Sequence, residues 1–306
     1  MEAMVKLCEL VNDLKLELLT KEIDYSQIDI VSKDINRPGI QLAGFLEYYD
    51  PKRIQVLGYV EMMYLSKLNY SERVKIYNDL LALGAPCYIL CRGLIPDDLF
   101  LTIAEERGIP IFTTNEVTSA FMSALIRWLH LNLGPVITIH GCLIDIYGTG
   151  VFIQGGSGIG KSEATLELVK RGHRLISDDA VEIHKASDVT LYGKAPANIK
   201  DFIELRGIGI VDAKTLYGVQ SILVTQKIDL VVTLVEWKQE HNYDRLGLED
   251  KYIDILGNKI INYVIPLRPG RNLAVILESA AINFRQKQMG YNTTKEILKR
   301  ANKSFG

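Results

Sequence analysis

A glycine-rich segment between an apolar run and a helical pattern constrains the fold of this chain more than any other feature. Residues 155–162 read GGSGIGKS and fit the pattern G-x-x-x-x-G-K-[ST]. The preceding run, 144–153, indicates strand material, and 161–171 predicts a helix with Gly172 as its C-terminal cap residue. Strand, loop, lysine, hydroxyl and helix in this order indicate a phosphate-binding loop, the alternative being a glycine-rich turn that matches by coincidence.

Each residue type in this segment suits nucleotide chemistry. Glycines let backbone N–H groups turn toward phosphate oxygens, and the start of a helix adds a positive dipole end. Lys161 would reach the β- and γ-phosphates, and the Ser162 hydroxyl would bind Mg²⁺. The candidate nucleotide-binding residues are Gly155, Gly156, Ser157, Gly158, Ile159, Gly160, Lys161 and Ser162.

Length, composition and charge restrict the other possibilities. A chain of 306 residues exceeds one ordinary core, so we expect two domains. A net charge of −2 gives no overall attraction to nucleic acid or to an anionic membrane, and apolar runs such as 228–235 are only strand-sized. The acidic N-terminus lacks a small-residue cleavage site, which favours a cytoplasmic protein. We read the scattered Cys8, Cys87, Cys91 and Cys142 as reduced, mostly buried thiols and not as a metal site.

The first domain is predicted over residues 1–133. Apolar runs at 28–31, 40–41, 54–57, 87–91 and 109–113 alternate with helical patterns at 59–65, 71–83, 96–107 and 116–133. This alternation is typical of a small α/β domain with a mostly parallel sheet, and we find no catalytic motif in it. Gly134 and Pro135 stop the last helix and mark the predicted boundary.

The second domain, 134–306, contains many short strands and few helices. Strands are expected at 136–140, 142–147, 151–153, 175–176, 181–184, 189–192, 230–235 and 259–266, with a final helix over 272–289. A nucleotide-binding sheet with mixed strand directions fits this pattern better than a fully doubly wound fold.

Polar residues near the expected strand ends are candidates for catalysis. Asp178 and Asp179 follow an apolar run, where an acid can hold Mg²⁺ or orient a nucleophile, and successive side chains would leave a strand on opposite faces. A turn-forming acid pair is the alternative. His140 also ends a predicted strand, although a lone histidine is more often structural.

Three further segments combine charge with glycine or proline. Residues 203–209 offer Glu204 as an Mg²⁺ ligand, with the end of a helix as the competing interpretation. The segments 243–247 and 266–271 contribute Arg245 and the pair Arg268 and Arg271, which could hold a phosphoryl group or form ordinary salt bridges.

Taken together, these residues resemble the bifunctional HPr kinase/phosphorylase family, most strongly over 134–291. The resemblance rests on His140-Gly141, the loop 155–162 followed by Glu163, and the segments 171–175, 178–179, 203–209, 244–247 and 266–272. The ordered set is far more specific than the phosphate loop. Gly156 departs from the family, which usually has an acidic residue there.

The resemblance implies an α/β protein whose second domain is a P-loop kinase core like that of phosphoenolpyruvate carboxykinase. It implies Mg²⁺-dependent transfer of a phosphoryl group from ATP, or from pyrophosphate, to a serine of HPr, the carrier protein of the sugar phosphotransferase system. The reverse task is attack of inorganic phosphate on phosphoserine-HPr, which yields pyrophosphate. Such enzymes regulate carbon metabolism, and a homohexamer is expected.

The same resemblance assigns roles to individual positions. Asp179 would be the acid and base, His140 and Arg245 would be catalytic, and Lys161 would hold phosphates. Ser162 and Glu204 would bind Mg²⁺. Residues expected to shape both reactions are Ile203, Glu204, Leu205, Arg206, Gly207, Ile208, Gly209, Ile210, Val211 and Asp212. Those expected to serve dephosphorylation are Pro266, Leu267, Arg268, Pro269, Gly270 and Arg271.

Two rival functions remain at this stage. A small-metabolite kinase or carboxykinase relative would use the same loop with a closed substrate pocket. A regulator that binds ATP without turnover would not need Asp179, His140 and Arg245 together, and their joint presence argues against it.

Overall fold

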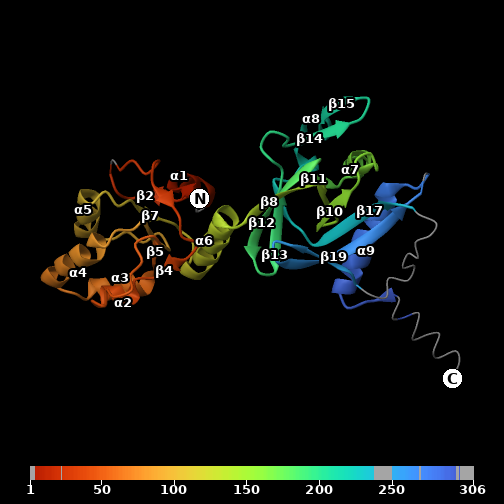
Figure 1. Ribbon diagram of the computed structural model, residues 1–306. Helices are drawn as coiled ribbons and strands as arrows, with labels where there is room; N and C mark the ends of the chain where they lie inside the picture. Colours follow the sequence, from red (N-terminus) through yellow and green to blue (C-terminus); the bar gives the residue numbers. More distant parts are fainter. Residues whose placement is uncertain (1–3, 22, 238–249, 269, 294–295, 297–306) are drawn as a thin grey trace, which may run out of the picture. The chain divides into compact units, whose positions relative to one another are not determined.

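The computed structural model describes residues 4–21, 23–237, 250–268, 270–293 and 296 (Figure 1). The chain divides into two compact units, Met1–Gly134 and Pro135–Gly306. No helix within the described ranges is long and apolar enough to cross a membrane.

The first unit is built on a five-stranded sheet in the order β2-β7-β6-β5-β4. The strands are β2 (Glu17–Leu18), β4 (Ile35–Asn36), β5 (Ile54–Leu57), β6 (Tyr88–Leu90) and β7 (Ile111–Thr113). Strands β4 to β7 are parallel, and β2 pairs antiparallel with β7. A short antiparallel pair, β1 (Val5–Lys6) and β3 (Asp29–Ile30), lies outside this sheet. The predicted mostly parallel sheet is confirmed.

Helices cover both faces of this sheet (Figure 1). They are α1 (Leu7–Leu14), α2 (Gly39–Leu42), α3 (Tyr59–Ser66), α4 (Tyr70–Ala82), α5 (Asp98–Glu106) and α6 (Thr118–Leu133). Because side chains alternate along a strand, Val56 packs with α1 and α6, whereas Leu57 packs with α2 to α5. The predicted strand at 40–41 is wrong: both residues lie in α2, since a two-residue run reveals no period and Pro38 begins a helical turn.

The second unit contains a six-stranded sheet in the order β11-β9-β10-β17-β19-β18. Its strands are β9 (Cys142–Ile146), β10 (Thr149–Gly155), β11 (Arg174–Ser177), β17 (Leu230–Glu236), β18 (Tyr252–Ile255) and β19 (Asn258–Leu267). Strands β10, β17 and β19 run parallel, while β9 and β18 pair antiparallel with their neighbours. The predicted mixed sheet is therefore confirmed.

A second layer and a small hairpin complete this unit. Strands β8 (Val136–His140), β12 (Ala180–Ser187), β13 (Thr190–Lys194) and β16 (Thr225–Lys227) form a sheet in the order β16-β13-β12-β8, and β14 (Phe202–Leu205) pairs with β15 (Gly209–Asp212). The helices are α7 (Lys161–Lys170), α8 (Ala213–Tyr217) and α9 (Leu273–Gln288), with a 3₁₀ turn at Val219–Ser221.

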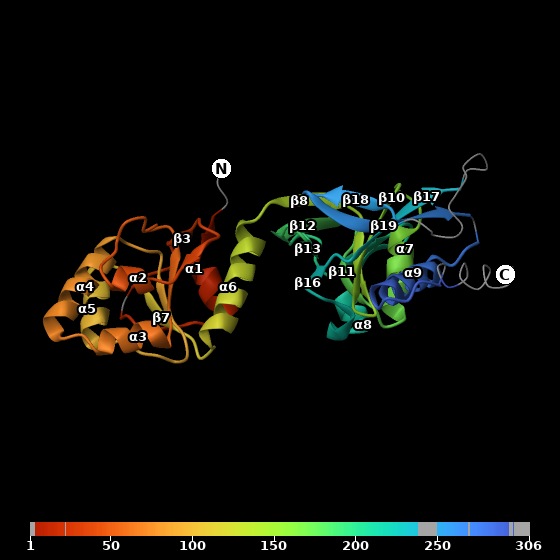
Figure 2. The same ribbon diagram turned by 90° about the horizontal axis from the view of Figure 1, so that it is seen from below.

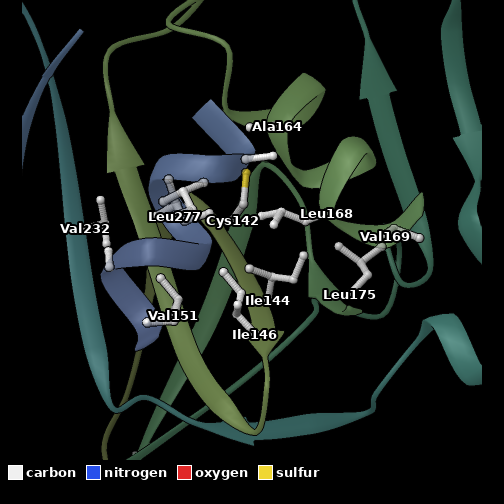
Figure 3. Close-up of a cluster of buried hydrophobic side chains, with 14 of the residues drawn as sticks. Cys142, Ile144, Ile146, Val151, Ala164, Leu168, Val169, Leu175, Val232 and Leu277 are labelled. Atoms are coloured by element: carbon white, nitrogen blue, oxygen red, sulfur yellow. The ribbon is translucent and has the colours of Figure 1, made fainter. Parts of the chain in front are cut away.

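The six-stranded sheet is buried on both faces, which explains its nearly continuous apolar strands. On one face Ile144 and Val232 pack against Leu168 of α7 and Leu277 of α9 (Figure 3). On the other face Phe152 and its neighbours pack against the four-stranded sheet. This arrangement fixes the end of β10 and the start of α7, between which the glycine-rich loop runs.

Candidate active site

The loop 155–160 needs its glycines for geometric reasons. A Cβ at Gly155 would lie 2.8 Å from the backbone oxygen of Leu234 on the neighbouring strand β17. Gly160, the residue before α7, has φ 94°, a left-handed conformation that other residues adopt only with strain. The chain therefore turns sharply off β10, and its backbone lies next to the start of a ten-residue helix. Such a turn can present N–H groups to an anion.

Lys161 and Ser162 open α7 and face the mouth of this loop. The Lys161 Nζ donates to the backbone oxygens of Gly155, at 2.9 Å, and Gly156, at 3.1 Å. The ammonium group is thus held over the loop. The Ser162 hydroxyl is hydrogen-bonded to the carboxylate of Asp178. Both side chains lie in positions from which they could contact phosphate oxygens or a cation.

Asp178 and Asp179 are adjacent in sequence but lie in opposite environments. Asp178 is 1% exposed, and its carboxylate accepts from the Cys142 thiol at 2.8 Å and from the Glu204 backbone N–H at 3.2 Å. Burial raises the pKa of Asp178, and these hydrogen bonds oppose that rise only in part. The Asp179 side chain is 64% exposed.

The reason for this division differs from the sequence prediction. The two residues do not alternate along a strand, because β11 ends at Ser177 and β12 begins at Ala180. They form the turn between the strands, and Asp179 has φ 69°. A left-handed conformation is uncommon outside glycine, although aspartate adopts it more readily than most residues, and residues held in such conformations cluster at functional sites.

Strand pairing brings His140 beside Asp179. Strands β8 and β12 pair antiparallel with His140 opposite Ala180. The His140 Nδ1 lies 3.1 Å from the Asp179 backbone oxygen and 3.7 Å from its Oδ1. Because both side chains are exposed, the imidazole can orient the carboxylate and still reach a substrate.

The hairpin β14–β15 supplies a second carboxylate. Ile203 and Leu205 are buried against the core of the second unit, so the alternating Glu204 points to the opposite side. The alternative that this segment ends a helix is wrong. Beyond Glu204, the Arg206 Nη2 donates to the Ser157 Oγ at 2.7 Å, which ties the hairpin to the loop.

These elements enclose a cavity of about 120 Å³. Its lining includes Ser157, Lys161, Ser162, Asp179, Glu204 and Arg206. Residues separated by about fifty positions in sequence therefore meet around one small polar space. The remaining residues of the predicted segment, from Gly207 to Asp212, do not line this cavity, and Ile208 and Ile210 are largely exposed.

Arg268 and Arg271, which define the arginine loop, lie beside a larger cavity that also borders the glycine-rich loop. This cavity, of about 1200 Å³, is lined by Gly158, Gly160, Arg268 and Arg271 among others. The Arg268 guanidinium stacks on the ring of Trp237, 3.7 Å from its centroid. Two predicted residues, Arg245 and Pro269, lie outside the described residues.

Sequence reasoning missed the buried half of this site. The sequence predicts that Asp178 and Asp179 share a metal-binding or nucleophile-orienting role, but it does not predict that Asp178 is buried, and for Cys142 it predicts only a buried thiol. The Cys142 thiol donates a hydrogen bond to the Asp178 carboxylate, and burial raises the pKa of the Cys142 thiol above its ordinary value. The two residues are far apart in sequence, and the contact arises because β11 pairs with β9, which places Ser177 opposite Leu143 and so brings Asp178 beside Cys142.

Comparison with known proteins agrees with this architecture. Two protein families match this chain. The family described as HPr Serine kinase N terminus matches residues 5–129, and the family described as HPr Serine kinase C-terminal domain matches residues 132–301. The chain therefore belongs to the HPr kinase/phosphorylase family of enzymes, and the resemblance predicted from the motifs is confirmed.

Individual relatives match over nearly the whole chain. The HPr kinase/phosphorylase of Lachnoclostridium phytofermentans is 53% identical over 296 residues, which cover 97% of this chain and 96% of that protein. The one of Caldicellulosiruptor bescii is 48% identical over 297 residues, with 97% and 96% covered. Among solved structures, the Hpr(Ser) kinase/phosphatase of Coxiella burnetii is 32% identical, with a TM-score of 0.48, and covers 53% of this chain and 98% of its own.

Proposed function

We propose that this protein phosphorylates a serine of the carrier protein HPr, with ATP or pyrophosphate as donor, and that it also performs the reverse phosphorolysis. In the reverse reaction inorganic phosphate attacks the phosphorus of phosphoserine-HPr, which yields unphosphorylated HPr and pyrophosphate. The meeting of Lys161, Ser162, Asp179 and Glu204 around one cavity carries this proposal. Whole-length identity to relatives named for both activities favours it over a small-metabolite kinase or a non-catalytic regulator.

The glycine-rich loop would bind the phosphoryl donor. Its backbone N–H groups, the start of α7 and the Lys161 ammonium offer positive charge to the β- and γ-phosphates. Arg206 lies against the loop, so a second cation borders the place where negative charge would gather. This geometry supports a donor with at least two linked phosphates, a description that fits both ATP and pyrophosphate.

Asp179 would move the proton in both directions. In phosphorylation its carboxylate accepts the proton of the serine hydroxyl while the serine oxygen bonds to phosphorus and the bond to the leaving phosphate breaks. In phosphorolysis the protonated carboxyl group returns a proton to the departing serine oxygen. Its exposure and the nearby His140 imidazole suit this exchange with a protein substrate that must dock from outside.

The donor set around the cavity fits Mg²⁺. Carboxylate and hydroxyl oxygens are the ligands that this cation prefers, and Glu204 and Ser162 offer one of each to the same space. The buried carboxylate of Asp178 accepts hydrogen bonds from the Ser162 hydroxyl and the Glu204 backbone N–H, so it helps to hold both residues in place. When bound, Mg²⁺ would neutralise charge on the donor phosphates. Arg245 and the loop 266–271 are proposed to stabilise the transferring group and to capture inorganic phosphate, respectively.

The proposal extends to assembly. A homohexamer would have a mass of about 206 kDa, six times the 34.4 kDa of one chain. Light scattering coupled to size-exclusion chromatography tests this point separately from activity.

A single assay tests the catalytic proposal. The protein is incubated with HPr, Mg²⁺ and either ATP or pyrophosphate, and the intact mass of HPr is followed. A gain of one phosphoryl group is expected, and addition of inorganic phosphate after removal of the donor should reverse it with release of pyrophosphate. A small-metabolite kinase would leave the mass of HPr unchanged, and so would a regulator that only binds nucleotide.

A further inference from the structure

The first unit has a cavity at the edge where its parallel strands end. After β4, β5 and β6 the chain passes to helices α2, α3 and α5 on one face of the sheet, whereas after β7 it passes to α6 on the other face. Figures 1 and 2 both show α6 across the sheet from α3 and α4. Loops that leave neighbouring strands toward opposite faces open a crevice at the carboxyl edge, and α/β proteins commonly bind ligands there.

This crevice is large enough for a small molecule. Its volume is about 490 Å³, within the usual range of ligand pockets. Apolar side chains of α3 and α6, including Val60, Met122 and Ile126, line one part of it. Tyr59 and Val60 are 56% and 71% exposed, so an apolar surface at the start of α3 is open to a ligand. This lining suits the flat face of a planar ring.

Two arginines give the cavity positive charge. Arg37, which follows β4, is held by an ion pair of 2.6 Å with Glu61, and the other carboxylate oxygen of Glu61 accepts from the Gly58 N–H at 3.0 Å. Glu61 is 7% exposed, so it acts as a fixed anchor for the guanidinium. Arg37 itself is 40% exposed and keeps N–H groups for another acceptor.

Arg92 is the more informative of the two. Its side chain makes no hydrogen bond or ion pair with any residue that the structure describes. Its backbone has φ 66°, where glycine would be more stable, and it is fixed there by the hydrogen bond from its N–H to the Glu116 oxygen at 2.9 Å. Arg92 is exposed at the mouth of the cavity, and its guanidinium keeps its N–H groups available, so it is placed to contact an anion bound there.

We propose that this cavity binds a nucleotide, a site separate from the glycine-rich loop and beyond the function proposed above. The phosphate group contacts Arg92 and Arg37, since guanidinium groups bind phosphate oxygens in pairs. The base lies against Val60, Met122 and Ile126. The Ser119 and Ser123 hydroxyls, one turn apart on α6, line the same cavity and are placed to bind the sugar or phosphate oxygens.

Calorimetry on the full chain tests the site. The Lys161→Ala variant is used as the background, because it weakens binding at the glycine-rich loop. It is titrated with AMP, GMP, ribose 5-phosphate, adenosine and inorganic phosphate. AMP or GMP should bind with a dissociation constant at or below about the millimolar range. Adenosine, which lacks the phosphate, and ribose 5-phosphate, which lacks the base, should each bind at least about tenfold more weakly.

Arg92→Gly separates a binding role from a structural one. Glycine accepts the positive φ at this position, so the midpoint of thermal unfolding should stay the same or rise. The affinity for AMP or GMP should nevertheless fall about ten- to a hundredfold, as expected when a charged hydrogen-bonding partner is lost. Arg127→Ala, on α6 but outside the cavity lining, is the matched control and should leave affinity unchanged.

Two results would overturn the proposal as a whole, and a third would overturn its placement of the base. One is that neither nucleotide binds at millimolar concentration. The other is that a nucleotide binds but its affinity is the same with Arg92→Gly, since the binding would then reside at the glycine-rich loop or elsewhere. Equal affinity for ribose 5-phosphate and AMP would also contradict the assignment of the apolar wall to a base.

Discussion

The small cavity beside the glycine-rich loop and the cavity of the first unit both lie at strand ends, but they are lined by different kinds of groups. In the second unit, the loop 155–160 is proposed to act through its backbone N–H groups, and its four glycines lie within six residues of sequence. In the first unit, Arg37 and Arg92 come from loops after two different strands, and the apolar wall comes from two helices. A site made of backbone leaves a compact pattern in the sequence, whereas a site made of distant side chains leaves none.

The largest effect is expected when the ammonium group of Lys161 is removed from the glycine-rich loop. Lys161→Ala should lower kcat/KM for phosphorylation and phosphorolysis together, by about 10³- to 10⁵-fold, because a cation on the transferring phosphoryl group contributes on that order. Lys170→Ala, at the exposed end of the same helix, is the control. Rates are measured in both directions with HPr and phosphoserine-HPr. Near-normal turnover by Lys161→Ala would mean that the loop does not bind the donor.

Asp179→Asn should have the next largest effect. Loss of the proton acceptor should lower both rates by about 10²- to 10⁴-fold, while the affinity for ATP stays within a few-fold of normal. The exposed Asp188, whose side chain is 97% accessible, provides the control substitution to Asn. Single-turnover rates and ATP affinity are measured side by side. Phosphorolysis that survives when phosphorylation is lost would contradict one shared acid and base.

A smaller and asymmetric effect is expected at the arginine loop. Replacement of both Arg268 and Arg271 with Ala should raise the phosphate concentration needed for phosphorolysis by about tenfold, with less change in phosphorylation, because each removes a charged contact to phosphate. Lys259→Ala, at the far end of β19, is the control. Rates are recorded in both directions across a phosphate titration. Equal losses in the two directions would assign the loop to folding or to HPr docking.

Much of the second unit could be predicted because its signals are local. The strand predicted at 136–140 and the helix at 161–171 were found at Val136–His140 and Lys161–Lys170. The meeting of Lys161, Asp179 and Glu204 was expected only through the family resemblance, since nothing in their spacing gives a distance. The bond from Arg206 to Ser157 and the bond from Cys142 to Asp178 depend on how the hairpin and strands pack, so the sequence alone could not predict them.

In the first unit the secondary structure could be predicted from the sequence, but the cavity could not. Its alternating strands and helices were predictable, and yet no residue of its cavity was singled out. Arg92 is preceded by an apolar strand and followed by a glycine, a context that describes many ordinary turns. Its positive φ becomes visible only in the structure, as does the position of its guanidinium, which has no hydrogen-bonding partner among the described residues, at the mouth of the cavity.

The smallest effect expected concerns the buried carboxylates beside the two cavities. Glu61 in the first unit is neutralised by Arg37, whereas the described partners of Asp178 are neutral groups: a thiol, a hydroxyl and a backbone N–H. Burial therefore raises the pKa of Asp178 above its ordinary value of 3.8. The folded protein holds this proton at pH values at which the unfolded chain has released it.

Because the pKa of Asp178 is higher in the folded protein than in the unfolded chain, the protein loses stability as the pH rises. The contribution of Asp178 to stability is fully present below about pH 4 and is lost as the pH rises through its folded pKa. Asp178→Asn removes this titration. The stability of the variant, compared with that of the unsubstituted protein at the same pH, should therefore increase between about pH 4 and about pH 7. Urea unfolding across this range measures the difference, with the exposed Asp188→Asn as control. A difference that stays constant, or that moves the other way, would mean that the carboxylate is ionised in the folded protein through a cationic partner, and the contrast with Glu61 would then disappear.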